Sequence, residues 1–273
     1  TKLDHSMMLR SVTRRPPVLR EPDFRRLFVA DVFSQLSAHI ILLALPLTAV
    51  LTLDAGELEV GVLSALGTVA FLALGLPAGA WVDRMRRRHV LVVGDVGRAL
   101  LLATIPLAWW AGILTIWQLY VVAFLCGVLT VFFDVAYQSY LPHLVGRDRI
   151  VEGNSILEAV RAVSQMGAPT LAGGLVQWLT APLALAANAF TFAGSAVFVG
   201  LIRKREERPV LAPDSRLRRE IAEGLRFVLG NRLLRSIALC TGSFNLCMAM
   251  VTALEMVFLV RDVRDRRGAV LLD

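Results

Sequence analysis

Six ionisable side chains lie inside long apolar runs of this sequence and are its first candidates for chemistry. A charged side chain costs at least about 2.5 kcal/mol at the centre of a bilayer, so each one in an apolar segment indicates a function. Asp95 and Arg98 are three residues apart, which on a helix places them on one face, where their charges offset each other. Glu158 and Arg161 have the same spacing. The full set is Asp31, Asp95, Arg98, Asp134, Glu158 and Arg161.

Two interpretations of these charges stay open. In one, the side chains form a network that assembles in one conformation and opens in another, and so biases a two-state equilibrium. In the other, the side chains reach back to water near helix ends and only fix the depth of each helix. The network is favoured for Glu158 and Arg161, whereas the two interpretations are balanced for Asp31 and Asp134.

Polar side chains nearer the middle of the same runs predict a cavity for a proton or a substrate. They are Gln35, His39 and Gln165. Because imidazole changes charge near neutral pH, His39 is a candidate proton carrier. The alternative for His39 is a hydrogen-bonded packing residue, which is the commoner role of a single histidine in a helix.

A dense charge cluster separates two of the apolar runs. The stretch GAWVDRMRRRHV, residues 79–90, holds five charges and a histidine within seven positions. Its arginines contribute to the charge asymmetry discussed below. Asp83 beside Arg84, after Gly79, is the part that charge asymmetry leaves unexplained.

The elements that position these residues are transmembrane helices. Of the 273 residues, 56% are hydrophobic and 19% are charged, against roughly 25% charged in an average soluble domain. Apolar runs of about 20 residues are long enough to cross a bilayer as helices. The sequence therefore predicts an all-α polytopic membrane protein, with a six-helix bundle over residues 28–202. The predicted spans are 28–51, 60–82, 89–111, 114–138, 154–178, 181–202 and 237–260.

Lys and Arg predict the orientation of these spans. On one side, the tail 1–27 and the alternate connections hold 23 of them, whereas the three connections on the other side hold none. Since cytoplasmic loops carry an excess of Lys and Arg, the N-terminus is expected in the cytoplasm of a cell whose inner or plasma membrane holds the protein.

The segment after the sixth span predicts a boundary between two bundles. Residues 203–236 form a basic linker, in which Ile221, Leu225, Val228 and Leu229 have the spacing of an amphipathic helix on the inner membrane face. The seventh span, 237–260, would place the basic tail 261–273 outside, against the charge rule. Either the seventh span does not insert in register, or the chain is incomplete. An incomplete chain is the favoured explanation, with a read-through or frame error near Arg261 as one cause.

Several motifs together resemble the major facilitator superfamily. In the stretch 79–90, Gly79, Asp83, Arg84, Arg87 and Arg88 match the signature loop of that family, while Trp81 and Arg86 depart from it. MGAPTLAGGLV, with Gly167, Pro169, Gly173 and Gly174, is similar to a motif of its export members. The segments GDVGRALLL and FFDVAYQSYLPHLV resemble the branch of drug and siderophore exporters in particular.

The resemblance implies a transporter of twelve spans in two six-helix halves. It assigns the signature loop to a gate. The residues themselves favour a conformational hinge in the fifth span, because Gly167, Gly173 and Gly174 remove side-chain bulk and Pro169 removes a backbone hydrogen bond. The alternative is that these glycines only allow helices to pack. The resemblance also implies proton-coupled efflux of a drug-like or siderophore-like small molecule, with spans one, two, four and five lining the cavity. No cofactor is expected beyond the proton motive force, and the expected partners are membrane lipid, a small-molecule substrate and a missing C-terminal half.

Other function classes find no support in the sequence. It contains no nucleotide-binding loop, no zinc-protease motif and no nucleophile elbow, so neither an enzyme nor catalytic residues are expected. The cysteines Cys126, Cys240 and Cys247 lie in apolar runs without metal-ligand spacing, and the basic residues follow the membrane topology rather than indicating nucleic acid. The rival interpretation is a truncated, non-transporting fragment or membrane interaction module.

Overall fold

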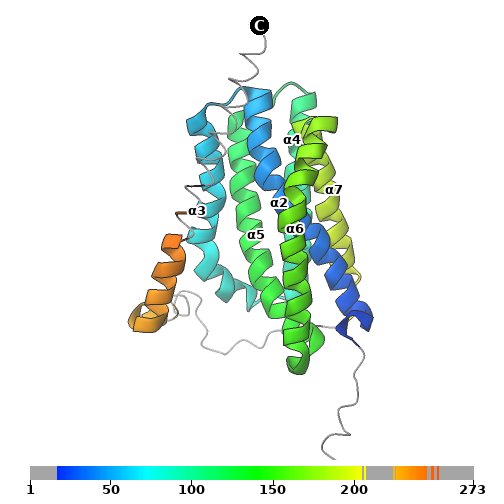
Figure 1. Cartoon of the computed structure of the whole chain (residues 1–273), viewed down its shortest axis with the longest axis vertical. Coiled ribbons are helices and arrows are strands. Elements are labelled where there is room, and N and C mark those ends of the chain that lie inside the picture. The colour runs from blue at the N-terminus through cyan, green and yellow to red at the C-terminus, as the bar shows by residue number, and fades with distance from the viewer. Residues whose placement is uncertain are drawn as a thin grey trace, which may run out of the picture.

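The computed structural model describes residues 17–204, 206, 224, 226–244, 247–248 and 251. The long helices named below run side by side (Figure 1). Two short 3-10 helices, η1 (Val18–Arg20) and η2 (Arg147–Arg149), precede α2 and α6, and the described residues include no strand. The expected all-α architecture is confirmed. The helices are α2 (Pro22–Leu53), α3 (Glu57–Val82), α4 (Arg87–Trp110), α5 (Ile116–Val145), α6 (Ile150–Leu179) and α7 (Ala181–Gly200).

The helices begin and end at local sequence signals. Pro22 occupies the first turn of α2, where its missing N–H costs nothing. At the other end, Asp54 adopts the left-handed conformation with φ 50° and stops the helix. Glu59 caps the start of α3, because its Oε2 accepts a hydrogen bond from the Gly56 N–H at 2.8 Å. Gly146, with φ 79°, ends α5.

Three helices extend by four or more residues beyond the spans predicted from apolarity. α2 begins at residue 22 rather than 28, α5 ends at 145 rather than 138, and α6 begins at 150 rather than 154. The additional turns are amphipathic and bury Phe24, Leu27, Tyr140 and Leu144 in the bundle. A search for apolar runs finds only the segment of each helix that crosses the hydrocarbon layer. The helix itself continues for as long as one of its faces packs against the bundle.

Five of the described helices are long and apolar enough to cross a membrane: α2, the Glu57–Gly75 part of α3, α4, α5 and α7. The predicted span 154–178 is helical within α6 but is not in this set. Glu158 and Arg161 in its first half and Gln165 and Pro169 in its second lower its hydropathy. α6 therefore lacks an apolar stretch as long as those of the five other helices.

The packing order of the helices leaves one face open. α4 packs mainly against α5 and α7, α7 also packs against α2, and α3 and α6 flank the bundle against α5 and α2 respectively. α3 and α6 do not pack against each other. We call the side between them, which carries Gln35, His39, Asp134, Glu158 and Arg161, the open face.

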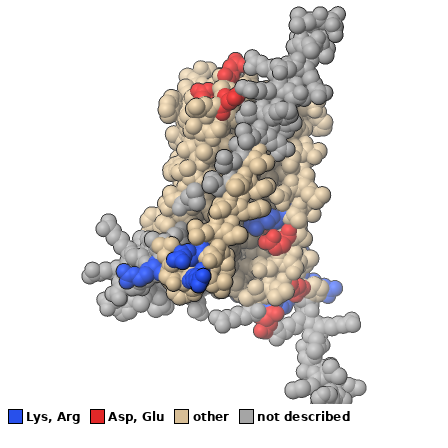
Figure 2. All heavy atoms as spheres, turned by 60° about the vertical axis from the view of Figure 1, so that its left-hand side comes forward, with Lys and Arg blue, Asp and Glu red and all other residues tan. Residues whose placement is uncertain are grey.

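The two ends of the bundle differ in charge. The α2–α3 connection carries Asp54, Glu57 and Glu59, and defines the acidic end. The α3–α4 connection carries Arg84 and Arg86, and defines the basic end. Figure 2 shows acidic side chains gathered at one end, and basic side chains together with some acidic ones near the other. A hollow lies between the two ends, with charged groups beside it.

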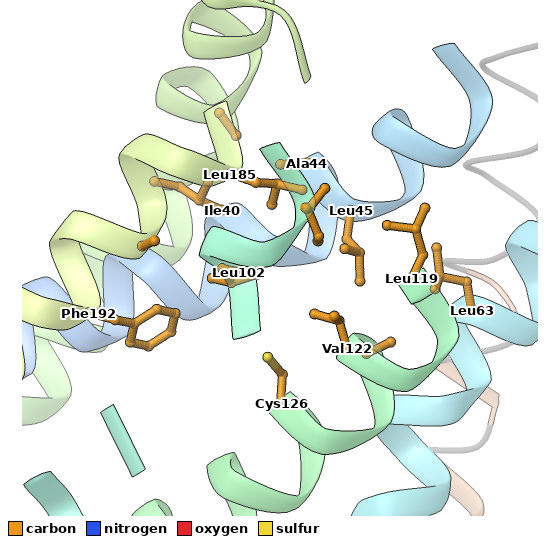
Figure 3. Close-up of a cluster of buried hydrophobic side chains, with 14 of the residues drawn as sticks. Ile40, Ala44, Leu45, Leu63, Leu102, Leu119, Val122, Cys126, Leu185 and Phe192 are labelled. Carbon is orange, nitrogen blue, oxygen red and sulfur yellow. The ribbon is translucent and has the colours of Figure 1, made fainter. Parts of the chain in front are cut away.

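Two clusters of buried apolar side chains fill the bundle. Side chains from α2, α3, α4, α5 and α7 converge in the cluster nearer the acidic end (Figure 3). The second cluster, nearer the basic end, includes Phe24, Leu91 and Tyr140. On α4, Leu102 belongs to the first cluster and Leu91 to the second, so Asp95 and Arg98 lie between the two.

Beyond α7, the structure describes helical residues 226–230 and 232–244. Asn231 caps the second of these helices, because its Oδ1 accepts a hydrogen bond from the Leu233 N–H at 3.0 Å. This helix therefore begins before the predicted seventh span, 237–260. Most of the rest of that span lies outside the described residues. So do most of the predicted linker 203–236 with Ile221 and Leu225, residues 1–16 of the predicted tail 1–27, and the predicted tail 261–273.

Candidate functional site

Asp95 and Arg98 on α4 form a buried ion pair between the two apolar clusters. Arg98 Nη2 donates to Asp95 Oδ1 at 2.5 Å, and the two side chains are 2% and 0% exposed respectively. The second Asp95 oxygen accepts from Ser195 Oγ on α7 at 2.5 Å. Arg98 Nη1 donates to Thr130 Oγ1 on α5 at 3.3 Å, and Ser34 Oγ on α2 lies 3.5 Å from both partners. The pair therefore connects α4 to α2, α5 and α7.

Two aromatic rings enclose the guanidinium of Arg98. The ring centroids of Phe133 on α5 and Phe192 on α7 lie 4.4 Å and 4.5 Å from its central carbon. The negative faces of the rings attract the cation, and the attraction is strongest where water is excluded. Arg98 is thus held inside the bundle, where it is also the larger of the two cationic neighbours of Asp134, ahead of Arg161.

Asp31 on α2 is a buried carboxylate without an ion pair among the described residues. It is 1% exposed, and its Oδ1 accepts from Gln35 Nε2 at 3.5 Å. Its Oδ2 has no hydrogen-bond partner in that part of the chain. The Tyr137 hydroxyl on α5 is an electrostatic neighbour but makes no hydrogen bond of standard geometry. A buried carboxylate with an oxygen left unpaired is costly, so it points to a role beyond packing.

Arg161 on α6 is the shared electrostatic neighbour of the acidic groups nearby. It interacts with Asp31 and His39 of α2 and with Asp134 of α5. It also pairs with Glu158 at 3.5 Å, and these side chains are 51% and 68% exposed respectively. Because the pair is long and exposed, Arg161 can exchange partners at low cost. The i, i+3 pairing predicted for both pairs is observed, in opposite environments.

The predicted cavity residues lie beside this charge group. Gln35 and His39 are half-buried on α2, and Gln165 is exposed on α6. The side chain of His39 makes no hydrogen bond to the described part of the chain, so the structure provides no partner for it as a hydrogen-bonded packing residue.

The signature-loop residues fall on two helix ends. Gly79 lies in the last turn of α3, and Asp83 follows that helix directly. Asp83 is exposed, and its side chain makes no hydrogen bond or ion pair with the residues described here. A Cβ added at Gly79 would meet nothing within 4 Å. Neither residue is therefore explained by packing within the described bundle. Arg84 is half-buried.

Arg87 and Arg88 belong to the first turn of α4 and have partners inside the chain. Arg88 Nε donates to the Val199 carbonyl at 3.3 Å, and Nη2 donates to the Gly200 carbonyl. These carbonyls end α7, so Arg88 caps the negative end of that helix. Arg87 pairs with Glu206 at 3.7 Å. The two arginines connect the loop to the end of α7.

The predicted hinge residues of α6 face away from the bundle core. A Cβ added at Gly167, Gly173 or Gly174 would meet nothing within 4 Å, and Pro169 is exposed. The contact of α6 with the bundle is instead made by Ser164, Ala168 and Ala172, which are buried at intervals of four residues. The glycines are therefore not required for close helix contact among the described residues.

Comparison with known proteins identifies the family. A sequence model of the Major Facilitator Superfamily matches residues 27–269. The chain belongs to this superfamily. The multidrug efflux pump Tap of Mycolicibacterium fortuitum is 31% identical over 70% of this chain and 48% of its own length. The uncharacterized MFS-type transporters y4rN of Sinorhizobium fredii and YfiS of Bacillus subtilis are each 23% identical, over 92% and 86% of this chain respectively.

This major facilitator chain spans only part of the relatives that it matches. It covers 48%, 61% and 55% of Tap, y4rN and YfiS respectively. Its described bundle of six long helices, α2 to α7, has the number of helices expected for one half of a transporter in this superfamily.

Several polar residues of this superfamily member were not singled out from the sequence. Ser34 and Ser195 bind the Asp95–Arg98 pair, Tyr137 lies beside Asp31, and Glu206 accepts a hydrogen bond at the start of α4. The aromatic rings around Arg98 also escaped prediction. The three hydroxyl-bearing residues follow no recognisable spacing, and their partners lie on other helices.

Proposed function

We propose that this chain supplies the N-terminal half of a secondary transporter that exports amphipathic small molecules in exchange for protons. Transport would proceed by alternating access between this bundle and a second one. Family membership supports a transporter, and the name of Tap supports efflux of drug-like molecules. We further propose that the basic end faces the cytoplasm of the inner or plasma membrane.

The observation that carries the proposal is the buried Asp31 together with the charged side chains of the open face beside it. Asp31 is buried with one oxygen unpaired in the described chain, and Arg161 is its half-exposed electrostatic neighbour. A carboxylate that gains a proton loses its attraction to Arg161, which can then turn to Asp134 or Glu158. Protonation would in this way change the contacts of α2, α5 and α6, the differential contact that a coupled transporter needs.

The signature loop is proposed as the gate of this transporter. Asp83 is exposed without a partner among the described residues, whereas Arg87 and Arg88 are held by Glu206 and the end of α7. Asp83 is therefore the member free to contact a second bundle. The glycines of α6 would similarly permit close approach of that bundle, because their surroundings are empty.

Ethidium uptake into inverted membrane vesicles tests the proposal. The full chain is expressed together with the C-terminal half of Tap as the second bundle, in a bacterial host lacking its own drug pumps, and ethidium is added to vesicles that hold a proton gradient. We expect ethidium uptake that a protonophore abolishes and that Asp31→Asn removes, while Ser155→Ala, an exposed change on α6, leaves it intact. Uptake that is insensitive to the protonophore would contradict proton coupling.

A second candidate function is an assembly module that does not transport by itself. It is favoured by the share of the relatives that the chain spans, about half of Tap. Normal membrane insertion without ethidium uptake would select this candidate over the first.

A further inference from the structure

A pocket at the basic end lies apart from the proposed transport path. It has a volume of about 610 Å³ and opens between the first turn of α4 and the end of α7. Arg86, His89 and Lys204 line it together with Arg88 and Glu206, and Val92 forms an apolar part of its wall. The lining therefore carries more positive than negative charge.

The cations of this pocket divide into two kinds. Arg88 is engaged by the carbonyls at the end of α7, and Lys204 Nζ donates to the Leu144 carbonyl at 2.9 Å. Arg86 and His89 are exposed, and their side chains make no hydrogen bond or ion pair within the described chain. Arg86 and His89 are thus available to bind a ligand, while Arg88 and Lys204 are fixed by their contacts within the chain.

Glu206 shows that the site accepts an anion. Its Oε2 accepts from the Arg88 N–H at 3.2 Å, and its Oε1 lies 3.7 Å from Arg87 Nη1. The Arg88 N–H belongs to the first turn of α4, where unpaired N–H groups and the helix dipole favour negative charge. The Glu206 carboxylate already occupies one of the anion-binding positions that the start of α4 provides.

An apolar strip runs from the pocket along the two helices. On α4, Val93, Val96 and Leu100 are 50%, 41% and 65% exposed respectively, and on α7, Val197 and Leu201 are 60% and 52% exposed. Both helices are apolar enough to span a membrane. The pocket therefore lies at the level where a bilayer places its head groups, with the strip at the level of the acyl chains.

We propose that this pocket binds the phosphate ester of an anionic phospholipid. Arg86 and His89 hold the phosphate beside Glu206, and the acyl chains lie along the strip on α4 and α7. Basic pockets between helix ends on the positively charged side of membrane proteins recognise such head groups. Free phosphate shares the charge and hydrogen-bonding chemistry but has nothing to place on the strip.

Lipid retention tests this site independently of transport. The purified full chain is mixed with phosphatidylglycerol or phosphatidylcholine in mild detergent, and bound lipid is counted by native mass spectrometry. We expect preferential retention of phosphatidylglycerol, reduced about fivefold by Arg86→Gln and further by the added His89→Gln. Arg25→Gln is the matched control, because Arg25 is likewise exposed at the start of α2 but lies outside the pocket.

Competition with inorganic phosphate separates the two sources of the anion. Phosphatidylglycerol that stays bound in excess phosphate supports the lipid site. Complete displacement by phosphate would overturn it in favour of a free-anion site. Equal retention by the wild type, Arg86→Gln and Arg25→Gln would overturn the pocket altogether. Arg86 and His89 are exposed, so their replacement should leave the helical circular dichroism unchanged. An unchanged spectrum shows that any loss of lipid reflects the site rather than the fold.

Discussion

Arg98 binds Asp95 at 2.5 Å in the interior of the bundle, where both side chains are almost completely enclosed. The pair lies between two apolar clusters and contacts three other helices. A buried charge is tolerated only when its partner and its hydrogen bonds are all present. The pair therefore fixes how α2, α4, α5 and α7 fit together.

Breaking this pair is expected to destabilise the bundle strongly. Asp95→Leu leaves the Arg98 charge buried without a partner, which costs about 3 to 5 kcal/mol in folding stability. The double variant Asp95→Leu, Arg98→Met should lose less than this single change, because no charge remains unpaired. Unfolding in mixed detergent micelles measures both.

The exposed pair on α6 provides the control for that experiment. Glu158→Gln removes an ion pair of the same spacing, but its side chains are half-exposed or more, so the loss should be below about 1 kcal/mol. Equal losses for Asp95→Leu and Glu158→Gln would contradict the enclosed role of Arg98.

The sequence predicted where the helices lie along the chain better than which face of each helix packs inside the bundle. Apolar runs identify helices because hydrocarbon requires them, and the i, i+3 spacing of Asp95 and Arg98 was enough to predict their pairing. α3 and α5, however, are apolar on nearly every side, so periodicity does not show which side packs. The separation of Arg98 from Arg161 depends on rings and hydroxyls from other helices, such as Phe192 and Ser195. Such long-range contacts leave no local pattern.

Glycines were similarly ambiguous in the sequence. Gly127 on α5 and Gly173 on α6 both lie within apolar helices, but their surroundings differ. A Cβ on Gly127 would approach the Gly67 Cα and carbonyl oxygen of α3 to 3.2 and 3.3 Å, whereas one on Gly173 would meet nothing within 4 Å.

Replacing these glycines should therefore give opposite results. Gly127→Ala forces α3 and α5 apart and should cost about 1 to 3 kcal/mol. Gly173→Ala should leave stability unchanged or improve it by up to about 1 kcal/mol, because alanine favours a helix. Thermal unfolding of the two variants distinguishes them. A destabilised Gly173→Ala variant would show that α6 packs more closely than described. If Gly173→Ala is stable but lowers ethidium uptake, the result supports the proposal that the glycines of α6 permit close approach of the second bundle.

Asp83→Asn should reduce transport without affecting the fold. Its carboxylate is exposed and makes no hydrogen bond or ion pair with the described residues, so neither insertion nor unfolding should change. If Asp83 closes the gate, ethidium uptake should fall by about tenfold or more, within the usual range of coupling between sites. Asp54→Asn, an equally exposed change at the acidic end, is the matched control. Unchanged uptake in Asp83→Asn vesicles would remove the gate assignment.

The orientation of the bundle can be measured with single cysteines at its two ends. Leu58, 80% exposed at the acidic end, and the exposed Arg86 at the basic end are each replaced by cysteine, after the three native cysteines have been changed to alanine. Because Lys and Arg are retained in the cytoplasm during insertion, a membrane-impermeant maleimide added to intact cells should label Leu58→Cys and not Arg86→Cys. Inverted vesicles should give the reverse pattern, which controls for reactivity. Labelling of Arg86→Cys in intact cells would place the basic end outside and would also move the proposed phospholipid pocket to the outer leaflet.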